Sequence, residues 1–264
     1  MGFLSEAVER LRKELDLHPL PERSLLLRTR SAPPIRDLAG ALRSPGVSII
    51  AEVKRATPWG GRVGEVDPGE QAALYERGGA AAVSVVTEPR YFQGSVLDLR
   101  SARRKCGLPL VRRDFILQPA QVMEARAEGA DAVWLAAAVL TRSELGDLQD
   151  VAADLGMASM VEVHSREDLK KAVGGEAQVI VLSARDPETL EVHPETPAEL
   201  AGRVPDDRIL VLEGGITSRS QILRAEEGGF RGVLVGEALM RSPNPVRTLR
   251  KLAGGLAIVN DPGT

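Results

Sequence analysis

The sequence contains little of several residue types, and each shortage excludes a class of protein. Its one cysteine, Cys106, has no disulfide partner within the chain, which fits a reducing, cytoplasmic setting. Aromatic residues make up only 3% of the chain, so leucine, valine and alanine must fill the core. No apolar run approaches the roughly 20 residues that cross a bilayer, and we expect no membrane partner.

The charges nearly cancel, since 34 lysines and arginines stand against 37 aspartates and glutamates to give a net charge of −3. The basic residues are interleaved with acids, as on a solvated helix face, and no basic cluster is long enough to bind nucleic acid. Residues 1–17 are amphipathic and contain acids, unlike a targeting peptide. We therefore expect a cytoplasmic protein that does not bind nucleic acid.

Eight short aliphatic runs recur at spacings of roughly 20 to 35 residues, the length of one strand and one crossover helix. The runs are continuously apolar, as in a parallel sheet that is buried on both faces. They are Val47–Val53, Ala81–Thr87, Leu108–Val111, Ala132–Ala137, Ala158–Val163, Val179–Ser183, Ile209–Glu213 and Gly232–Gly236. This repetition predicts an α/β protein, a (β/α)8 TIM barrel, which usually forms one domain of about 250 residues.

The segments between the runs have helical periodicity and polar caps. Ser165 is predicted to cap a helix that continues to Val173, and Thr217 or Ser218 to cap one that ends at Gly228. Glycines close these segments before the next aliphatic run, as αβ turns require. The alternation of strand and helix therefore extends along the whole barrel, which we place at residues 47–255.

Residues 1–46 lie outside the eightfold repeat and form an N-terminal helical extension. Leu4–Leu15 is predicted to be a helix, followed by a proline-containing loop and a short helix around Ile35–Leu42. We expect the extension to cover the bottom of the barrel or to flank its mouth. Residues 256–264 are expected to be a C-terminal tail.

In this fold the active site lies at the carboxyl ends of the strands, and the first strand ends in two charged residues. Glu52 and Lys54 are two apart, so they point to the same side of the strand, whereas Arg55 points away. Unpaired buried charges cost several kcal/mol. One interpretation is a structural ion pair, and the other is a lysine beside a reacting oxygen with a carboxylate as its charge partner.

Other strand ends also carry aromatic, acidic and basic residues. Phe92 follows the second run and forms either a wall for a planar ligand or ordinary loop packing. Arg113 and Phe115 follow the third run, and Glu162 adds a carboxylate at the fifth. Arg185 follows the sixth run, where its guanidinium can bind a carboxylate or phosphate through two nitrogens.

The last two strand ends contain glycines that allow backbone N–H groups to approach a phosphate. They read Glu213-Gly214-Gly215 and Gly236-Glu237. Glycine pairs also occur in ordinary turns, but their position after the seventh and eighth strands favours a phosphate site. A phosphorylated, carboxylate-bearing small molecule is therefore the expected ligand.

Several motifs resemble the indole-3-glycerol phosphate synthase family over essentially the whole chain. Ile50–Pro58 is similar to the first-strand signature of that family. Pro33–Leu42, Tyr91–Ser95 and Val233–Arg241 are also of its type, and the strand ends follow in the same order. The resemblance implies a barrel enzyme without a cofactor or metal.

The resemblance also implies a reaction and roles for the residues above. Members of the family close an indole ring on 1-(2-carboxyphenylamino)-1-deoxyribulose 5-phosphate and release carbon dioxide and water. This chemistry needs a group that polarises the ribulose carbonyl, an acid–base group and a phosphate anchor. The implied residues are Lys54 as the cationic acid, Glu52 as its partner, Glu162 for acid–base transfer, Phe92 and Phe115 against the ring, and Arg185 near the carboxylate.

The chain departs from the family pattern at several strand ends. Arg113 stands where a catalytic lysine is usual, and a guanidinium with a pKa above about 12 donates protons poorly. Ser183 replaces an asparagine and Gly214 a serine, which removes a hydroxyl from the phosphate end. Trp59 stands where a small serine is common. These changes predict slow or altered chemistry.

Alternative hypotheses stay open at this point. A paralogue that acts on a related phosphorylated aryl-amino sugar would use the reshaped pocket, and a non-catalytic barrel would only bind phosphorylated ligands. Metal-dependent epimerase chemistry lacks its ligands, because only His164 among His18, His164 and His193 lies near a strand end. Schiff-base chemistry at Lys54 has no support from neighbouring residues. We expect a monomer or a weak homo-oligomer.

Overall fold

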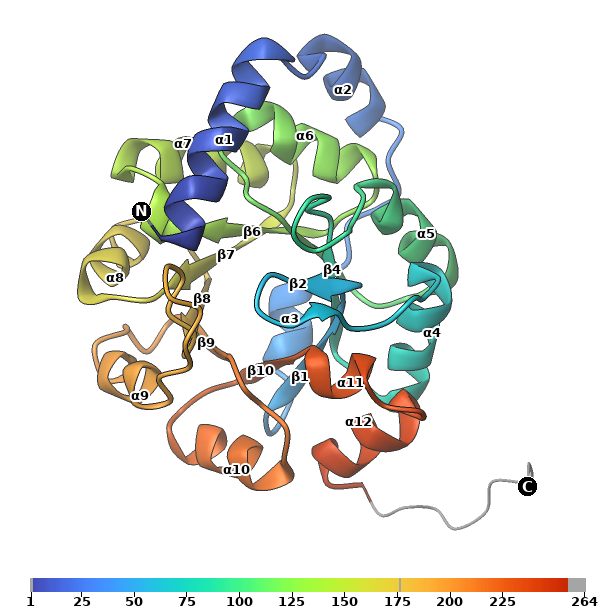
Figure 1. The fold of residues 1–264 in the computed structure, drawn as a ribbon, viewed down its shortest axis with the longest axis vertical. Coiled ribbons are helices and arrows are strands. Elements are labelled where there is room, and N and C mark those ends of the chain that lie inside the picture. Colours follow the sequence, from blue (N-terminus) through green and yellow to red (C-terminus); the bar gives the residue numbers. More distant parts are fainter. Residues whose placement is uncertain (1, 176, 256–264) are drawn as a thin grey trace.

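Parallel strands follow one another around a closed ring in this computed structural model, which describes residues 2–175 and 177–255 (Figure 1). The ring order is β1-β10-β9-β8-β7-β6-β5-β4, so each strand pairs with its neighbours in sequence and the last pairs with the first. The strands are β1 (Ser48–Val53), β4 (Ala82–Val86), β5 (Leu110–Arg113), β6 (Ala132–Ala136), β7 (Ala158–Val163), β8 (Val179–Ser183), β9 (Ile209–Glu213) and β10 (Gly232–Val235). The predicted (β/α)8 barrel is confirmed.

One predicted strand was misplaced along the chain. The third run was expected at Leu108–Val111, whereas β5 covers Leu110–Arg113. Pro109 cannot donate a backbone hydrogen bond, although its carbonyl accepts one from Val83 at 2.9 Å. Arg112 and Arg113 belong to the strand because they pair with Val85 and Val86 of β4, and acidic side chains neutralise both guanidinium groups.

Helices surround the ring and connect successive strands (Figure 1). They are α4 (Pro68–Gly78), α5 (Leu97–Lys105), α6 (Pro119–Ala127), α7 (Arg142–Asp154), α8 (Arg166–Val173), α9 (Glu195–Ala201), α10 (Arg219–Glu227), α11 (Glu237–Met240) and α12 (Pro245–Ala253), with a 3-10 turn η1 (Ala137–Val139). Ser165 and Ser218 cap α8 and α10 by accepting backbone hydrogen bonds, so Ser218 rather than Thr217 is the cap. A short hairpin, β2 (Ala56–Thr57) and β3 (Gly61–Arg62), follows β1.

The N-terminal extension contains one helix more than expected. The predicted first helix is confirmed as α1 (Phe3–Leu17), and the short third helix as α3 (Leu38–Leu42). The proline-containing segment between them was expected to be a loop, but it includes α2 (Glu22–Thr29). Leu25 on α2 is only 2% exposed, and Arg28 pairs with Glu128 next to α6. Tertiary packing therefore stabilises a short helix whose own apolar periodicity is weak.

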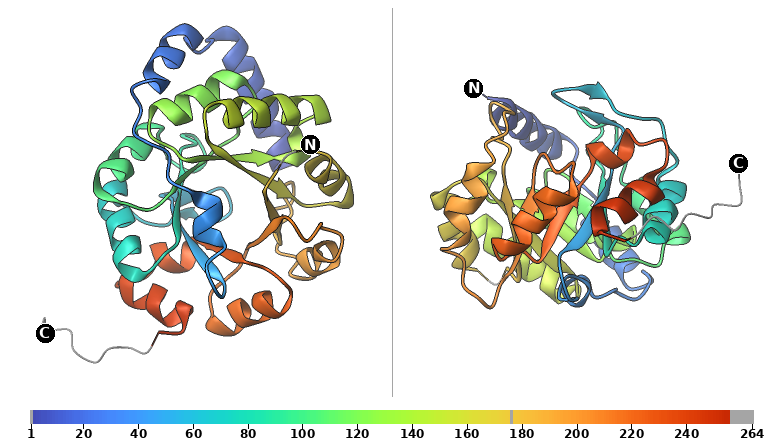
Figure 2. Two further views of the ribbon diagram at one scale, coloured as in Figure 1. Left: turned by 180° about the vertical axis from the view of Figure 1, so that it is seen from behind. Right: turned by 90° about the horizontal axis from the view of Figure 1, so that it is seen from below.

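The extension contacts both ends of the barrel. Figure 2 shows α3 across the barrel seen from behind, opposite the hairpin β2–β3. Leu38 and Leu42 pack there with inward-facing residues such as Ile50 and Met160, and all four side chains are buried. At the opposite end, Phe3 and Leu4 of α1 line a pocket among the strand ends. The extension therefore does both things that were expected as alternatives: α3 covers the bottom of the barrel, and α1 flanks its mouth.

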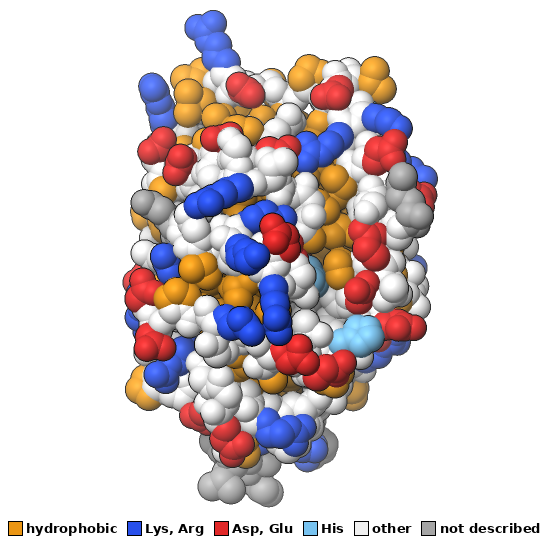
Figure 3. All heavy atoms as spheres, turned by 90° about the vertical axis from the view of Figure 1, so that its left-hand side faces the viewer, with side chains coloured by type: hydrophobic (Ala, Val, Ile, Leu, Met, Phe, Trp, Pro, Cys, Tyr) orange, Lys and Arg blue, Asp and Glu red, His pale blue; other side chains and the backbone are white. Residues whose placement is uncertain are grey.

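The outer surface carries mixed charges. On the face shown in Figure 3, lysine and arginine side chains are interspersed with aspartate and glutamate. Among the described residues, every helix is too short or too polar to span a bilayer. The expected C-terminal tail, residues 256–264, lies outside the described residues.

Leu42 tests how much the packing of α3 contributes to stability. Its side chain is fully buried, so Leu42→Ala should lower the free energy of unfolding by about 2–5 kcal/mol, because the lost methyl groups leave a cavity. Leu223→Ala on α10 is the matched control, since Leu223 is 43% exposed and its loss should change stability by at most about 0.5 kcal/mol. Urea denaturation measures both, and equal losses would contradict a packed interface beneath the barrel.

Candidate active site

A pocket with about 680 Å³ of empty space, including its open mouth, lies among the carboxyl ends of the strands. Most of the predicted catalytic and aromatic residues reach it from different strands. Its lining includes Phe92, Arg113, Phe115, Glu162, Ser183, Arg185 and Glu213. The fold thus brings together residues from positions 92 to 213, as the predicted strand order requires.

Arg113 is the centre of the polar groups in this pocket. Its Nη1 lies 2.5 Å from Glu52 Oε1, and its Nη2 lies 3.2 Å from Glu213 Oε1 and 3.6 Å from Glu162 Oε1. Burial lowers the pKa of Arg113, but the three carboxylates outweigh this effect and raise it. Arg113 is therefore a permanent cation that orients acids from β1, β7 and β9.

Glu52 on β1 and Lys54, which directly follows β1, form the ion pair that their two-residue spacing allows. Lys54 Nζ lies 2.6 Å from Glu52 Oε2, and Glu52 is fully buried. Burial raises the pKa of Glu52, but Lys54 and Arg113 reverse the shift, so the pKa is lowered and the carboxylate stays ionised. Neither residue contributes to the pocket wall, but Lys54 Nζ lies 5.6 Å from the ring centre of Trp59, which does.

Gly236 has a role that the sequence did not indicate. A Cβ atom at this position would lie 2.4 Å from Glu52 Oε2 and 3.0 Å from Lys54 Nζ, distances that require one of them to move. The absence of a side chain at Gly236 therefore leaves room for the buried ion pair. Its predicted contact with phosphate remains a prediction.

Glu162 lies between an indole N–H group, a guanidinium and an imidazole ring. Trp134 Nε1 donates to its Oε2 at 3.0 Å, and its Oε1 lies 3.6 Å from both Arg113 Nη2 and His164 Nε2. Burial raises the pKa of Glu162, but His164, Arg113 and Trp134 together lower it to about 2. At neutral pH the carboxylate is therefore ionised and can accept a proton.

Trp134 is a pocket residue that the sequence analysis missed. It lies on β6, fully surrounded, with its ring 4.4 Å below the guanidinium carbon of Arg113. A cation over an aromatic face is stabilised by the ring quadrupole. A tryptophan inside a run of small aliphatic residues, in a chain with only two tryptophans, was the available signal.

The β8 and β9 ends are joined by Ser183 and Glu213. The two residues are register partners, and Ser183 Oγ donates to Glu213 Oε2 at 2.5 Å. This hydroxyl leaves Glu213 Oε1 for Arg113. Ser183 therefore orients an acid, and a direct contact with substrate remains a prediction.

Aromatic side chains form the outer wall of the pocket. Trp59 lies edge-on to Phe92 with ring centres 6.4 Å apart, and the Arg185 guanidinium carbon lies 3.8 Å from the Trp59 ring centre. Phe3 of α1 lies 6.5 Å from Phe115. Phe3 was not predicted, because nothing in the sequence connects the N-terminus to β5.

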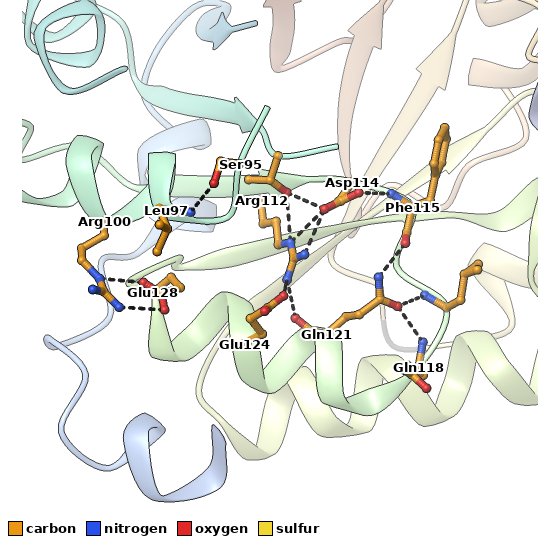
Figure 4. Close-up of polar contacts among 12 residues, drawn as sticks. Ser95, Leu97, Arg100, Arg112, Asp114, Phe115, Gln118, Gln121, Glu124 and Glu128 are labelled. Carbon is orange, nitrogen blue, oxygen red and sulfur yellow. Dashed lines mark hydrogen bonds and ion pairs between the residues drawn. The ribbon is translucent and has the colours of Figure 1, made fainter. Parts of the chain in front are cut away.

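A second polar network supports the end of β5 from outside the barrel (Figure 4). Arg112 points away from Arg113 and donates to Asp114 Oδ2 at 2.9 Å and to the Gln121 carbonyl at 2.8 Å. The backbone nitrogen of Phe115 donates to Asp114 Oδ1, and the backbone carbonyl of Phe115 accepts from Gln121 Nε2, both at 2.9 Å. Phe115 is therefore fixed on both sides by hydrogen bonds.

The predicted phosphate end is formed mainly by backbone. Gly214 and Gly215 have φ angles of 105° and 72°, a left-handed region that strains other residues, so glycine is required for this turn. Glu237 Oε1 accepts from Arg241 Nε at 2.9 Å, so its carboxylate is paired with the residue that follows α11. Gly214, Gly215, Gly236 and Glu237 do not belong to the aromatic pocket, and their role in phosphate binding stays a prediction.

Metal ligands do not cluster in the described part of the chain. No group of three or more histidine, cysteine, aspartate or glutamate side chains is arranged there to hold an ion. The carboxylates of the pocket instead face guanidinium, ammonium and indole N–H groups.

Comparisons with known proteins point to one family over nearly the whole chain. The family model for indole-3-glycerol phosphate synthase matches residues 4–252. An indole-3-glycerol phosphate synthase of Aquifex aeolicus is 40% identical over 256 residues, 96% of this chain and 100% of the relative. That of Rhodococcus opacus is 44% identical over 223 residues, 84% of this chain and 83% of the relative.

Solved structures with low identity share the fold alone. A tryptophan synthase alpha-subunit of Pyrococcus furiosus has a TM-score of 0.58 at 16% identity, covering 78% of this chain and 98% of its own. A mandelate oxidase mutant with (S)-mandelic acid has a TM-score of 0.62 at 17% identity, covering 89% and 84%.

The contact between Gly236 and the Glu52–Lys54 pair can be tested by adding one methyl group. Gly236→Ala should lower the free energy of unfolding by about 1–3 kcal/mol, because the Cβ atom displaces buried, paired charges. Gly202→Ala is the control, since nothing lies within 4 Å of its added Cβ atom. If both variants unfold at the same urea concentration as the wild type, Gly236 does not limit the space around the pair.

Proposed function

Because the chain belongs to the indole-3-glycerol phosphate synthase family, we propose that it is a carboxy-lyase of tryptophan biosynthesis. Its substrate is 1-(2-carboxyphenylamino)-1-deoxyribulose 5-phosphate, on which it closes the indole ring with loss of carbon dioxide and water. The observation that carries this assignment is Arg113 with Glu52, Glu162 and Glu213 around it, at the base of a pocket with aromatic walls. Such fixed charges suit a reaction in which charge develops on the carbonyl oxygen and the ring nitrogen.

Ring closure requires a cation near the ribulose carbonyl oxygen. Lys54 takes this role from its place beside the pocket, where its ammonium pairs with Glu52 Oε2 at 2.6 Å. Arg113 adds a fixed positive charge that stabilises the same oxygen but transfers no proton, because its pKa is raised. Lys54 is therefore the proton donor for the ring-closing step.

Substrate binding is divided among the remaining strand ends. Phe92 and Phe115 lie against the aromatic ring, and Arg185, stacked on Trp59, binds the carboxylate before it leaves as carbon dioxide. The backbone at the ends of β9 and β10 binds the phosphate through Gly214, Gly215 and Gly236, with Glu237 paired to Arg241 beside it. Glu162 is the acid–base group of the dehydration, since its carboxylate is ionised and faces the pocket.

Indole fluorescence on mixing the protein with the substrate tests the reaction. We expect product from the wild type and a loss of at least about 100-fold in Lys54→Ala, because the acid is removed. Lys170→Ala on α8 is the control, since that side chain is 77% exposed and does not line the pocket.

The alternatives make different predictions in the same assay. Absence of product, together with calorimetric binding of the substrate, would favour a phosphate-ligand-binding barrel. Saturable turnover of another phosphorylated aryl-amino sugar, without turnover of this substrate, would favour a specialised paralogue. Trp59 and Trp134 give that second case its structural basis, because both indoles occupy the pocket wall.

Exchange of Arg113 for lysine tests whether the guanidinium limits the rate. Arg113→Lys should raise kcat about tenfold or more, because an ammonium can transfer a proton where a guanidinium cannot. Steady-state kinetics by indole fluorescence measure the change. Equal or lower kcat, with unchanged stability in urea, would show that the absence of a proton donor at position 113 does not limit the rate.

A further inference from the structure

His164 follows β7 in the pocket wall, and none of the roles above uses it. Its Nδ1 lies 2.9 Å from the backbone carbonyl oxygen of Arg185. Because a carbonyl oxygen can only accept, Nδ1 must carry a hydrogen. The tautomer of the ring is therefore fixed by the loop that follows β8.

The other ring nitrogen faces a carboxylate. Nε2 lies 3.6 Å from Glu162 Oε1, while Glu162 Oε2 accepts from Trp134 Nε1. A neutral ring with its hydrogen on Nδ1 would direct the lone pair of Nε2 toward the negatively charged Oε1, and the two would repel each other. A doubly protonated ring presents an N–H group instead, so the geometry favours an imidazolium beside an ionised Glu162.

The charges around the ring support the extra proton. Arg113 and Lys54 pair with the three carboxylates Glu52, Glu162 and Glu213, and Glu162 is the one of these that faces the His164 ring. Asp168 of α8 accepts from the His164 backbone nitrogen at 3.3 Å, and Asp186 and Arg185 lie on the loop after β8. Burial lowers the pKa of His164, but Glu162, Glu213 and Asp168 outweigh it and raise the pKa.

We propose that His164 is a positioning residue that stores a proton against Glu162 and supplies it for the dehydration. This proposal rests on the proposed function of the same site. It answers a chemical requirement, because a carboxylate that is ionised at neutral pH has no proton to give to a departing hydroxyl group. The imidazolium provides one at the oxygen that Trp134 leaves free.

The transfer balances over one turnover. When substrate binding brings Nε2 and Glu162 Oε1 from 3.6 Å to hydrogen-bonding distance, the Nε2–H bond breaks as an O–H bond forms on Oε1, leaving a neutral ring with its hydrogen on Nδ1. Glu162 then protonates the hydroxyl group, whose carbon–oxygen bond breaks to release water. The proton lost from the neighbouring carbon as the ring becomes aromatic returns to Glu162 and then to Nε2, so no outside acid is consumed.

Two substitutions separate the nitrogens of the ring. An asparagine amide occupies about the place of Nδ1 and can keep the hydrogen bond to the Arg185 carbonyl. A glutamine amide reaches about the place of Nε2 and can keep a donor toward Glu162. Neither amide releases a proton at neutral pH, so both should lower kcat about 10- to 100-fold while KM changes little.

The pH profile separates proton storage from a structural role. In the wild type, kcat should fall as pH rises through the raised pKa of His164, because the stored proton is lost above it. His164→Asn and His164→Gln should lack this alkaline fall. His193→Asn is the control with unchanged kcat and profile, since its ring is exposed and lies between Glu191 and Glu195.

Nuclear magnetic resonance of 15N-labelled histidine reads the proton without turnover. The chain has three histidines, so the signal missing from His164→Asn belongs to His164. A free histidine side chain has a pKa of about 6.5. Just above that pH we expect both ring nitrogens of His164 still to carry hydrogens. When the ring loses a proton at higher pH, Nδ1 should keep its hydrogen and Nε2 should lose it.

Clear results would overturn the proposal. One such result is a His164 ring that is already neutral just above pH of about 6.5. Another is a neutral ring that carries its hydrogen on Nε2. A third is a His164→Asn variant with the kcat and pH profile of the wild type. A wild type that forms no indole would instead overturn the proposed function, and the resonance titration would still decide whether His164 holds a proton against Glu162.

Discussion

The pairing of Arg113 with carboxylates from three other strands is the constraint on which the rest of the site depends. Each of these charges would cost several kcal/mol to bury alone, and removal of one partner would leave another uncompensated. Because Glu52, Glu162 and Glu213 come from β1, β7 and β9, their side chains are oriented by a common cation and not by their own loops. The polar base of the pocket is therefore one electrostatic unit.

The barrel brings the side chains of this unit together. Parallel strands in register bring Glu213 opposite Ser183 and Glu162 opposite Ala136, so side chains from distant parts of the chain share one layer. The layer beneath is closed by apolar residues and by α3, whose Leu42 is fully buried. Water is thereby excluded from one side of the charges, while the pocket admits a ligand from the other.

Acid–base chemistry at this site is distributed over neighbouring groups. Arg113 stays charged and Glu162 stays ionised. The transferable proton is assigned to His164, whose ring lies between Glu162 and the loop after β8. The same geometry gives Trp134 two contacts, one with the Arg113 guanidinium and one with Glu162. Substitution of any one member therefore changes the environment of the others.

The sequence by itself determined the barrel, because eight continuous apolar runs at strand–helix spacing have few other solutions. It also determined that Glu52 and Lys54 share a side of their strand, since that follows from the two-residue period. Only the tertiary structure decided that Arg113 pairs with three carboxylates, that Gly236 makes room for the buried pair, and that Trp134 and His164 contact Glu162. These contacts join strands far apart in sequence, and local periodicity carries no information about which of their side chains meet. For the same reason the segment of α2 was expected to be a loop, because its packing on α6 cannot be read from its own residues.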